Sequence, residues 1–184
     1  MSRAGQGESH CVRSGSRYGV ISDTHGKLSP RVFQLFHGVD GIIHGGDFCD
    51  EDVLESLRAI APVFAVHGNC DRFPLVTMLP KLGVFTLAGQ KVVVVHELGR
   101  PEWPLPSVRS ALKAECPRVV VFGHSHRPCA VEAGGVLYFN PGSPTVVRDP
   151  GVDRSVGYLD LSPDAVSWEL VSLGDECRKG RPTR

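Results

Sequence analysis

The sequence predicts a single α/β domain, because short apolar runs alternate with amphipathic helical stretches along its first half. The chain has 184 residues, of which 41% are hydrophobic, which is enough for one domain with a sizeable core and short for two. Five of the apolar runs end in a residue that can hold a cation. Because ligands bind at the carboxyl ends of parallel strands in open sheets, we expect these residues to meet at one sheet edge.

The first half of the chain follows the order strand, helix, strand, helix, strand. Strands are expected at the apolar runs 18–22, 41–46 and 62–68. Ser29 followed by Pro30 predicts the start of a short helix. Its apolar face comprises Val32, Phe33, Leu35 and Phe36. Asp50 begins a second helix, whose apolar residues recur at helical spacing as far as Pro62. This alternation implies right-handed crossovers and a parallel sheet that is buried on both faces.

The second half predicts a sheet of mixed direction. Segment 72–82 contains two prolines and no clean period, so we expect a loop there. Runs 84–87 and 91–95 flank Ala88-Gly89-Gln90, a three-residue connection that is typical of an antiparallel hairpin. After a proline-rich loop, a helix should end before Pro117, with Val108, Ala111 and Leu112 facing inward. Beyond the apolar run 118–122, strands at 136–139, 155–161 and 166–173 are expected to form a C-terminal meander.

The two ends of the chain differ from its middle in composition. Residues 1–16 have low hydrophobicity and no period, so we expect a disordered leader. Residues 174–184 are polar and basic and predict a flexible tail. The folded domain is therefore expected to span residues 17–173.

Charge and cysteine content exclude several classes of protein. Twenty basic and twenty acidic side chains give a formal net charge of zero, so no global field draws the protein to nucleic acid or to an anionic membrane. The six cysteines are scattered, without a C-x-x-C pair, which favours free thiols in a reducing compartment. The chain shows neither a signal-peptide pattern nor an apolar window long enough to cross a bilayer, so we expect a cytoplasmic protein.

The polar residues that follow the apolar runs are candidate metal ligands. They are Asp23, His25, Asp47, Asn69, His96, His124 and His126. Each alone has a simpler explanation, since a lone histidine is more often structural and a lone aspartate is often a helix cap. Together they offer carboxylate, amide and imidazole donors, a set that suits Mn²⁺, Fe²⁺, Zn²⁺ or Ni²⁺. A pair of cations about 3.5–4 Å apart, sharing a carboxylate and a hydroxide, would be the natural use of such a set.

Five blocks of sequence carry a resemblance to a known family. They are Asp23-Thr24-His25, Gly46-Asp47, Gly68-Asn69-Cys70-Asp71, His96 and Gly123-His124-Ser125-His126. In order and spacing they resemble the signature of the calcineurin-like metallophosphoesterases, over roughly residues 17–145. The short length and the Gly-Asn-Cys-Asp block are similar to the small single-domain phosphodiesterases of bacteria and archaea. The resemblance implies a four-layer α/β sandwich of two mixed β-sheets flanked by helices, with a dinuclear metal site at the C-terminal strand ends.

The resemblance also implies a role for each candidate ligand. One metal would be held by Asp23, His25, Asp47 and His126. Asp47 would bridge to a second metal, which Asn69, His96 and His124 would complete. Mn²⁺ is the expected ion at both positions. The implied activity is that of a phosphodiesterase, in which a bridging hydroxide attacks a small phosphodiester in line. The implied catalytic residues are Asp47, Asn69, Cys70 and His124.

The chain departs from the usual pattern of this family at two places. Cys70 stands where the larger phosphatases carry a histidine, which removes the expected general acid. Glu97-Leu98 follow His96 where Gly-His is usual, so the shape of the pocket near the second metal stays open. We expect His44 and His67 to be structural.

Residues beside the ligand blocks are expected to line the site. Arg72 or Arg127 is a candidate contact to a phosphoryl oxygen, and solvated surface arginines are an equally good interpretation. The turn Asn140-Pro141-Gly142-Ser143 is expected to line the site without binding metal.

Other functions remain open at this point. The chain could be a phosphomonoesterase, a mononuclear metalloprotein, or a scaffold that has lost catalysis, as in the retromer subunit that shares this fold. The complete donor set favours an enzyme, since charged ligands are costly to keep side by side without a metal. A homo-oligomer is compatible with the sequence.

Overall fold

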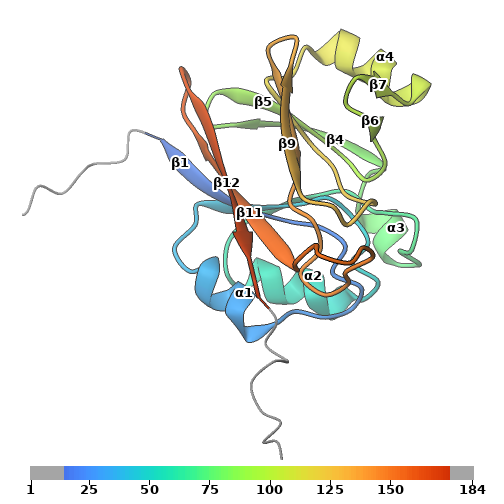
Figure 1. Cartoon of the computed structure of the whole chain (residues 1–184), viewed down its shortest axis with the longest axis vertical. Helices are drawn as coiled ribbons and strands as arrows, with labels where there is room; N and C mark the ends of the chain where they lie inside the picture. The colour runs from blue at the N-terminus through green and yellow to red at the C-terminus, as the bar shows by residue number, and fades with distance from the viewer. Residues whose placement is uncertain (1–14, 175–184) are drawn as a thin grey trace, which may run out of the picture.

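Two five-stranded mixed sheets form the core of the computed structural model, which describes residues 15–174 (Figure 1). The first sheet has the order β12-β11-β1-β2-β3, and the second has the order β4-β5-β8-β10-β9. The strands of the first sheet are β1 (Ser16–Ile21), β2 (Gly41–His44), β3 (Val63–Ala65), β11 (Ser155–Leu161) and β12 (Val166–Ser172). Those of the second are β4 (Leu82–Leu87), β5 (Gln90–Val95), β8 (Val119–Val121), β9 (Cys129–Ala133) and β10 (Val136–Asn140). A small ribbon pairs β6 (Gly99–Arg100) with β7 (Trp103–Pro104).

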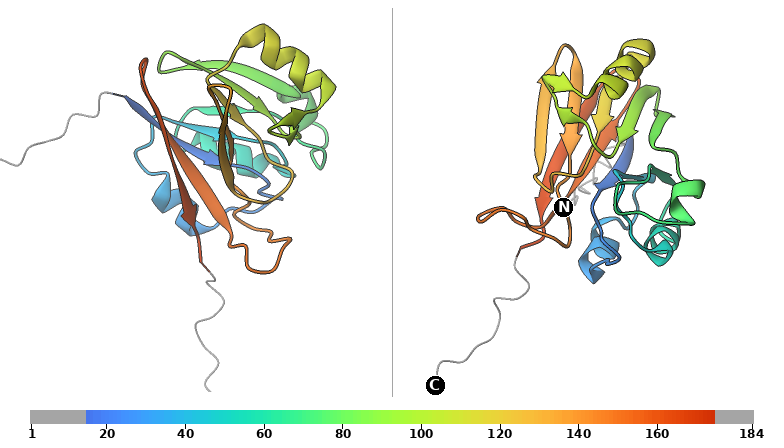
Figure 2. Two further views of the ribbon diagram at one scale, coloured as in Figure 1. Left: turned by 45° about the horizontal axis from the view of Figure 1, so that its top comes forward. Right: turned by 90° about the vertical axis from the view of Figure 1, so that its right-hand side faces the viewer.

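Helices cover the outer face of each sheet (Figure 2). They are α1 (Pro30–Leu35), α2 (Glu51–Arg58), α3 (Leu75–Met78) and α4 (Pro106–Glu115). One buried cluster joins α1 and α2 to the first sheet, a second fills the space between the sheets, and a third joins α4 to the second sheet. Along β5, Val92 and Val94 face the other sheet while Val93 and Val95 face α4, so the strand is buried on both sides. The predicted four-layer sandwich is confirmed.

The predicted helix starts are confirmed by their caps. The Ser29 side chain accepts a hydrogen bond from the backbone N–H of Arg31, and Asp50 accepts one from Asp52. One detail of the first helix is wrong, because Phe33 is 40% exposed and does not belong to the apolar face.

Three predictions about the second half are wrong. The hairpin between β4 and β5 pairs Leu87 with Gln90, so its turn has two residues rather than three. Segment 72–82 is not all loop, since it contains α3 and the start of β4. The C-terminal meander does not form: β10 lies in the second sheet between β8 and β9, while β11 and β12 extend the first sheet. Strand β9 was not predicted, because it is half-buried and lacks a clear apolar alternation.

The predicted leader and tail lie outside the described residues, except for Gly15 and Ser16 at one end and Gly174 at the other. Ser16 already belongs to β1. The limits of the domain stay a prediction. Among the residues described, no helix has both the length and the apolar content to cross a membrane.

The parallel strands bring the predicted site together. In the first sheet β1, β2 and β3 are parallel neighbours, and in the second sheet β8 runs parallel to both β5 and β10. The loops after β1, β2, β3, β5 and β8 carry all seven candidate ligands. The site therefore lies where the carboxyl ends of strands from two sheets meet.

Candidate metal centre

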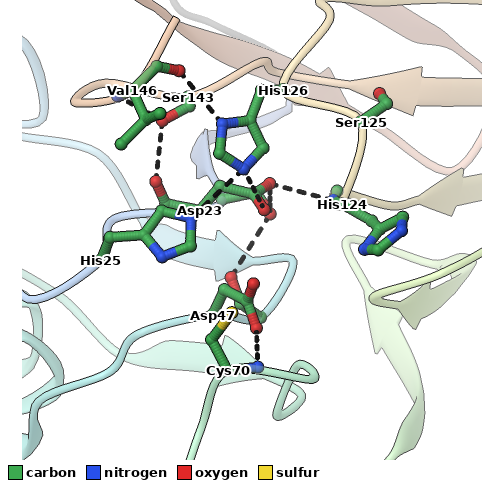
Figure 3. Close-up of polar contacts among 12 residues, drawn as sticks. Asp23, His25, Asp47, Cys70, His124, Ser125, His126, Ser143 and Val146 are labelled. Atoms are coloured by element: carbon green, nitrogen blue, oxygen red, sulfur yellow. Dashed lines mark hydrogen bonds and ion pairs between the residues drawn. The ribbon is translucent and has the colours of Figure 1, made fainter. Parts of the chain in front are cut away.

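All seven predicted ligands converge at this junction (Figure 3). Figure 3 shows Asp23, His25 and His126 meeting on one side of the site, with Asp47 and His124 beside them. On the other side the Oδ1 atom of Asn69 lies 3.0 Å from His96 Nε2 and 3.0 Å from His124 Nδ1. Residues up to 103 positions apart, from Asp23 to His126, thus form one cluster of oxygen and nitrogen donors.

The backbone at the site adopts an uncommon conformation. Five of the predicted ligands have positive φ angles: Asp23 (55°), His25 (46°), Asp47 (60°), His124 (68°) and His126 (59°). Non-glycine residues rarely adopt this region, and each such residue costs on the order of 1 kcal/mol. Such strain is typical of a site where the direction of a side chain matters more than local stability.

The first group of donors consists of Asp23, His25 and His126, whose ligand atoms lie within 4.8 Å of one another. The Nδ1–H of His126 donates to the backbone carbonyl of Val146 at 3.1 Å, which leaves a lone pair on Nε2. This Nε2 lies 3.2 Å from His25 Nε2 and 3.2 Å from Asp23 Oδ1. Burial raises the pKa of Asp23, but His126, His96 and Ser22 outweigh burial and hold it below its usual value.

The second group lies around His96, which is buried. Its Nδ1–H donates to the carbonyl of Gly45 at 2.9 Å, and its Nε2 lies 3.0 Å from Asn69 Oδ1 and 3.4 Å from Asp47 Oδ2. Burial lowers the pKa of His96, yet Asp47 outweighs it and the pKa is raised. Burial likewise raises the pKa of Asp47, but hydrogen bonds from His96 and the Cys70 backbone hold it well below its usual range.

The donor set fits divalent cations. The carboxylate atom Asp23 Oδ1 is buried without a hydrogen-bond partner, and the Nε2 atom of His126 lies 3.2 Å from it and 3.2 Å from His25 Nε2. Electron-rich atoms this close repel one another unless a proton or a cation lies between them. Asp23 also groups with Asp47 and His96 within 4.8 Å, so the two carboxylates lie between the two sets of imidazoles.

Asp71 holds the backbone of the site, a role that sequence reasoning missed. Its buried carboxylate accepts three backbone N–H groups, from Gly68 at 2.7 Å, Cys49 at 2.7 Å and Asp47 at 3.1 Å. It thereby ties the loop after β3 to the loop after β2. The available signal was its place as the last residue of the Gly-Asn-Cys-Asp block.

The turn after β10 supports the site from behind. The Asn140 side-chain amide donates to the carbonyl of Gly123 at 2.9 Å, and the Ser143 hydroxyl donates to the carbonyl of Asp23 at 2.8 Å. This turn therefore fixes the backbone beside two of the predicted ligands, Asp23 and His124.

The structural interpretation of His44 is confirmed. His44 Nδ1 accepts a hydrogen bond from the backbone N–H of Gly46 at 3.0 Å, its Nε2–H points to the Thr24 hydroxyl at 3.2 Å, and its ring stacks on Phe48 at 3.5 Å. Burial lowers the pKa of His44 to about 3, so the ring is neutral at physiological pH. The ring of His67 contacts the carbonyl of Gly68 at 3.3 Å.

Two cysteines border the candidate centre. Cys70 Sγ accepts a hydrogen bond from the Asn69 amide at 3.3 Å, and the Cys70 backbone N–H donates to Asp47 Oδ1 at 2.8 Å. Burial and the neighbouring Asp47 carboxylate raise the pKa of the Cys70 thiol. Cys49 Sγ lies 3.4 Å from His25 Nδ1, and burial together with Asp47 raises its pKa to about 12.

Glu97 and Leu98, the unusual pair after His96, lie in different surroundings. Leu98 is buried in the core beneath α4, so it offers nothing to the site. Glu97 Oε1 lies 3.9 Å from His124 Nε2 and stays largely exposed. Glu97 also lines a cavity of about 360 Å³ that runs from Asn69 and His96 toward Lys81.

The two candidate arginines differ in their surroundings. Arg127 is paired with Asp149 through a short contact between its Nε and the carboxylate. Arg72 is exposed, and its side chain makes no hydrogen bond or ion pair with residues 15–174.

Comparisons with known proteins agree with this geometry. A model of the calcineurin-like phosphoesterase superfamily domain matches residues 17–164. The chain is 32% identical over 161 residues to a probable metallophosphoesterase of Methanothermobacter thermautotrophicus, covering 85% of this chain and 92% of the relative. It is 31% identical over 182 residues to the phosphodiesterase YfcE of Escherichia coli, covering 84% of this chain and 91% of the relative. Among solved structures, Vacuolar Protein Sorting 29 of Cryptosporidium parvum has a TM-score of 0.73 at 22% identity, covering 88% of this chain and 93% of that one. At this identity the likeness concerns the fold alone.

Proposed function

Because the chain belongs to the calcineurin-like phosphoesterase superfamily, we propose that it is a phosphodiesterase that works with two divalent metal ions. The broader statement rests on the family: the protein is a hydrolase that acts on phosphoester bonds with the help of divalent metal ions. The number and identity of the ions, the residues that hold them and the preference for diesters are our proposals.

The proposed ligand sets follow the two groups of donors. The first ion would be held by Asp23, His25, Asp47 and His126, and the second by Asn69, His96 and His124, with Asp47 shared between the two. We propose Mn²⁺ at both positions, since oxygen and imidazole donors without thiolate suit it. When bound, such ions supply Lewis acidity toward phosphoryl oxygens and a water-derived nucleophile at neutral pH.

One observation carries this proposal. The Nε2 atoms of His25 and His126 lie 3.2 Å apart, His126 Nε2 lies 3.2 Å from the buried Asp23 Oδ1, which accepts no hydrogen bond, and a carbonyl fixes the tautomer of His126. Two imidazole nitrogens and a carboxylate oxygen gathered this closely form an arrangement that a metal ion can bind. A cation is the simplest group that satisfies them together.

The residues around the ligands suit a diester better than a monoester. Glu97 places a carboxylate 3.9 Å from His124, where it repels a dianionic monoester more strongly than a monoanionic diester. Leu98 leaves this side without the donor that a histidine would supply. Both observations support a substrate with a single negative charge.

The site has a poor general acid for giving a proton to the leaving group. Cys70 occupies the place of the usual acid, and its raised pKa keeps the proton on sulfur at neutral pH. His124 is a second polar side chain here, with Nδ1 3.0 Å from Asn69 Oδ1 and Nε2 3.9 Å from the exposed Glu97. We therefore propose that esters with acidic leaving groups, such as aryl diesters, are cleaved faster than alkyl esters.

Arg72 remains a proposed contact to the phosphoryl group, because its guanidinium is free to reach a ligand. Arg127 is a poorer candidate, since Asp149 already engages it. The four cysteines that the structure describes are free thiols, which supports a reducing compartment such as the cytoplasm.

A scaffold without catalysis is the alternative function. The fold that this chain shares with Vacuolar Protein Sorting 29 is compatible with such a role. The complete donor set argues against it, because carboxylates and imidazoles packed this closely are costly without a metal.

The test compares three substrates on the Mn²⁺-loaded protein: a bis-aryl phosphate, an aryl phosphate monoester and an alkyl diester. We expect kcat/KM to fall in that order for the wild type, and we expect Cys70→His to raise the rate on the alkyl diester most. A preference of the wild type for the monoester would contradict the assignment. No hydrolysis of any ester by the fully loaded protein would favour the scaffold.

A further inference from the structure

A second group of metal-binding atoms lies on the outer side of His25. It consists of His25, Cys49 and Cys70, whose nitrogen and two sulfur atoms all lie within 4.8 Å of one another. The three residues come from the loops after β1, β2 and β3 respectively, so the fold rather than the local sequence brings them together. Figure 3 shows Cys70 beside Asp47.

His25 serves this group with the ring nitrogen that the candidate dinuclear centre does not use. Its Nε2 faces His126 at 3.2 Å, whereas its Nδ1 faces Cys49 Sγ at 3.4 Å. In a tetrahedral zinc site, bond lengths of about 2.3 Å to sulfur and about 2.05 Å to nitrogen place these ligands roughly 3.6 Å apart. The observed 3.4 Å between His25 Nδ1 and Cys49 Sγ is close to that value.

The backbone around Cys49 is fixed in the conformation that aims its sulfur at His25. Cys49 has a positive φ of 63°, and its N–H donates to Asp71 at 2.7 Å. The carboxylates of Asp47 and Asp71 lie close to both thiols and favour a positive charge there. Cys49 itself is exposed, so an ion can reach the group from solvent.

We propose that His25, Cys49 and Cys70 form a third cation site, which takes a thiophilic divalent ion such as Zn²⁺ and shares His25 with the dinuclear centre. Two thiolates and an imidazole are soft ligands that select zinc over manganese, so the site differs in preference from its neighbour. Binding releases the two thiol protons to solvent and changes no oxidation state.

Because both metal sites would use His25, metal binding at one site should affect metal binding at the other. An ion held through Nδ1 draws electron density from the ring and fixes its orientation, which changes what Nε2 offers on the other side. We expect saturation with Zn²⁺ to change the affinity of the remaining centre for Mn²⁺, and we expect this coupling to disappear without Cys49.

The experiment uses Co²⁺ as a spectroscopic probe on the full chain, stripped of metal and kept reduced. The wild type should develop a thiolate-to-cobalt charge-transfer band in the near ultraviolet, and Zn²⁺ should abolish it. Cys49→Ser should lose the band and bind about one Zn²⁺ fewer per chain. The matched control is Cys116→Ser, which removes another exposed thiol at the end of α4 and should behave as the wild type.

Two results would overturn the proposal. A wild type without the band, or a band that persists in Cys49→Ser, would show that Cys49 is no ligand. A disulfide between Cys49 and Cys70 in the protein as purified, retained under mild reduction and accompanied by no bound zinc, would assign the pair to a covalent link instead. These outcomes are independent of ester hydrolysis, so an inactive protein with the band would contradict the proposed function and leave the thiol site standing.

Discussion

Replacing Asp71 by asparagine should weaken both the fold and the metal centre, although Asp71 is not a proposed ligand. Its carboxylate accepts backbone N–H groups from Gly68 and Asp47 on Oδ2 and from Cys49 on Oδ1. An asparagine has the same shape but turns one of these two oxygens into a donor.

The size of the effect follows from the three hydrogen bonds. If the amide oxygen keeps the bonds to Gly68 and Asp47, the bond from Cys49 is lost and two donors face each other. A hydrogen bond to a charged group contributes about 1.5–3 kcal/mol and a neutral one about 0.5–1.5 kcal/mol. One lost bond and two weakened ones should lower the free energy of unfolding by roughly 3–5 kcal/mol. A typical domain has a free energy of unfolding of about 5–15 kcal/mol, so the variant is still expected to fold.

The assay is urea denaturation of the metal-free wild type, of Asp71→Asn and of Asp164→Asn, a control in an exposed turn of the described chain. The free energy of unfolding of the control should stay within about 0.5 kcal/mol of the wild-type value. Mn²⁺ affinity of Asp71→Asn should fall about 10–100-fold, because the backbone that aims Asp47 is released. If Asp71→Asn lowered the free energy of unfolding by less than about 1 kcal/mol and left Mn²⁺ binding unchanged, the role of Asp71 would be refuted.

Three further predictions concern charge at and near the site. Glu97→Gln should raise the rate on an aryl monoester about threefold relative to a diester. The reason is that one unit of extra charge about 6 Å away is worth roughly 0.7 kcal/mol in a water-like medium. An equal change on both substrates, or the same change in Glu102→Gln, would count against this prediction. His44 should make the metal-free fold sensitive to acid: its folded pKa of about 3 lies below the unfolded value of about 6.5, so below that value the unfolded state binds a proton that the folded state does not. The free energy of unfolding should therefore fall by roughly 1.4 kcal/mol from about pH 7.5 to about pH 5.5 because of His44. Urea denaturation at these two pH values should show that His44→Gln lacks this contribution. Asp47→Asn should reduce hydrolysis by orders of magnitude with retained secondary structure by circular dichroism, and a variant within about tenfold of the wild type would exclude Asp47 as the bridge.

The convergence of the seven candidate ligands could be predicted from the sequence because its signals are local. Each candidate ligand follows a buried apolar strand, and the carboxyl end of a parallel strand is a fixed place in the fold. The helix caps at Ser29 and Asp50 were equally local, since the cap and the N–H that it binds lie two residues apart.

The errors concern partners that are distant in sequence. The apolar pattern of β10 predicts a strand but does not say that it inserts between β8 and β9 rather than beside β11. The role of Asp71 is to bind backbone N–H groups of another loop, and the Gly-Asn-Cys-Asp block marks this residue without naming those partners. The approach of Cys49 to His25 is likewise a product of the tertiary fold.

The most direct test of the central claim is anomalous diffraction from crystals soaked in Mn²⁺, measured on both sides of the manganese absorption edge. The proposal predicts two peaks about 3.5–4 Å apart, one among Asp23, His25 and His126 and one among Asn69, His96 and His124, with Asp47 between them. A single peak, or none at these residues despite saturating Mn²⁺, would contradict a two-metal phosphodiesterase.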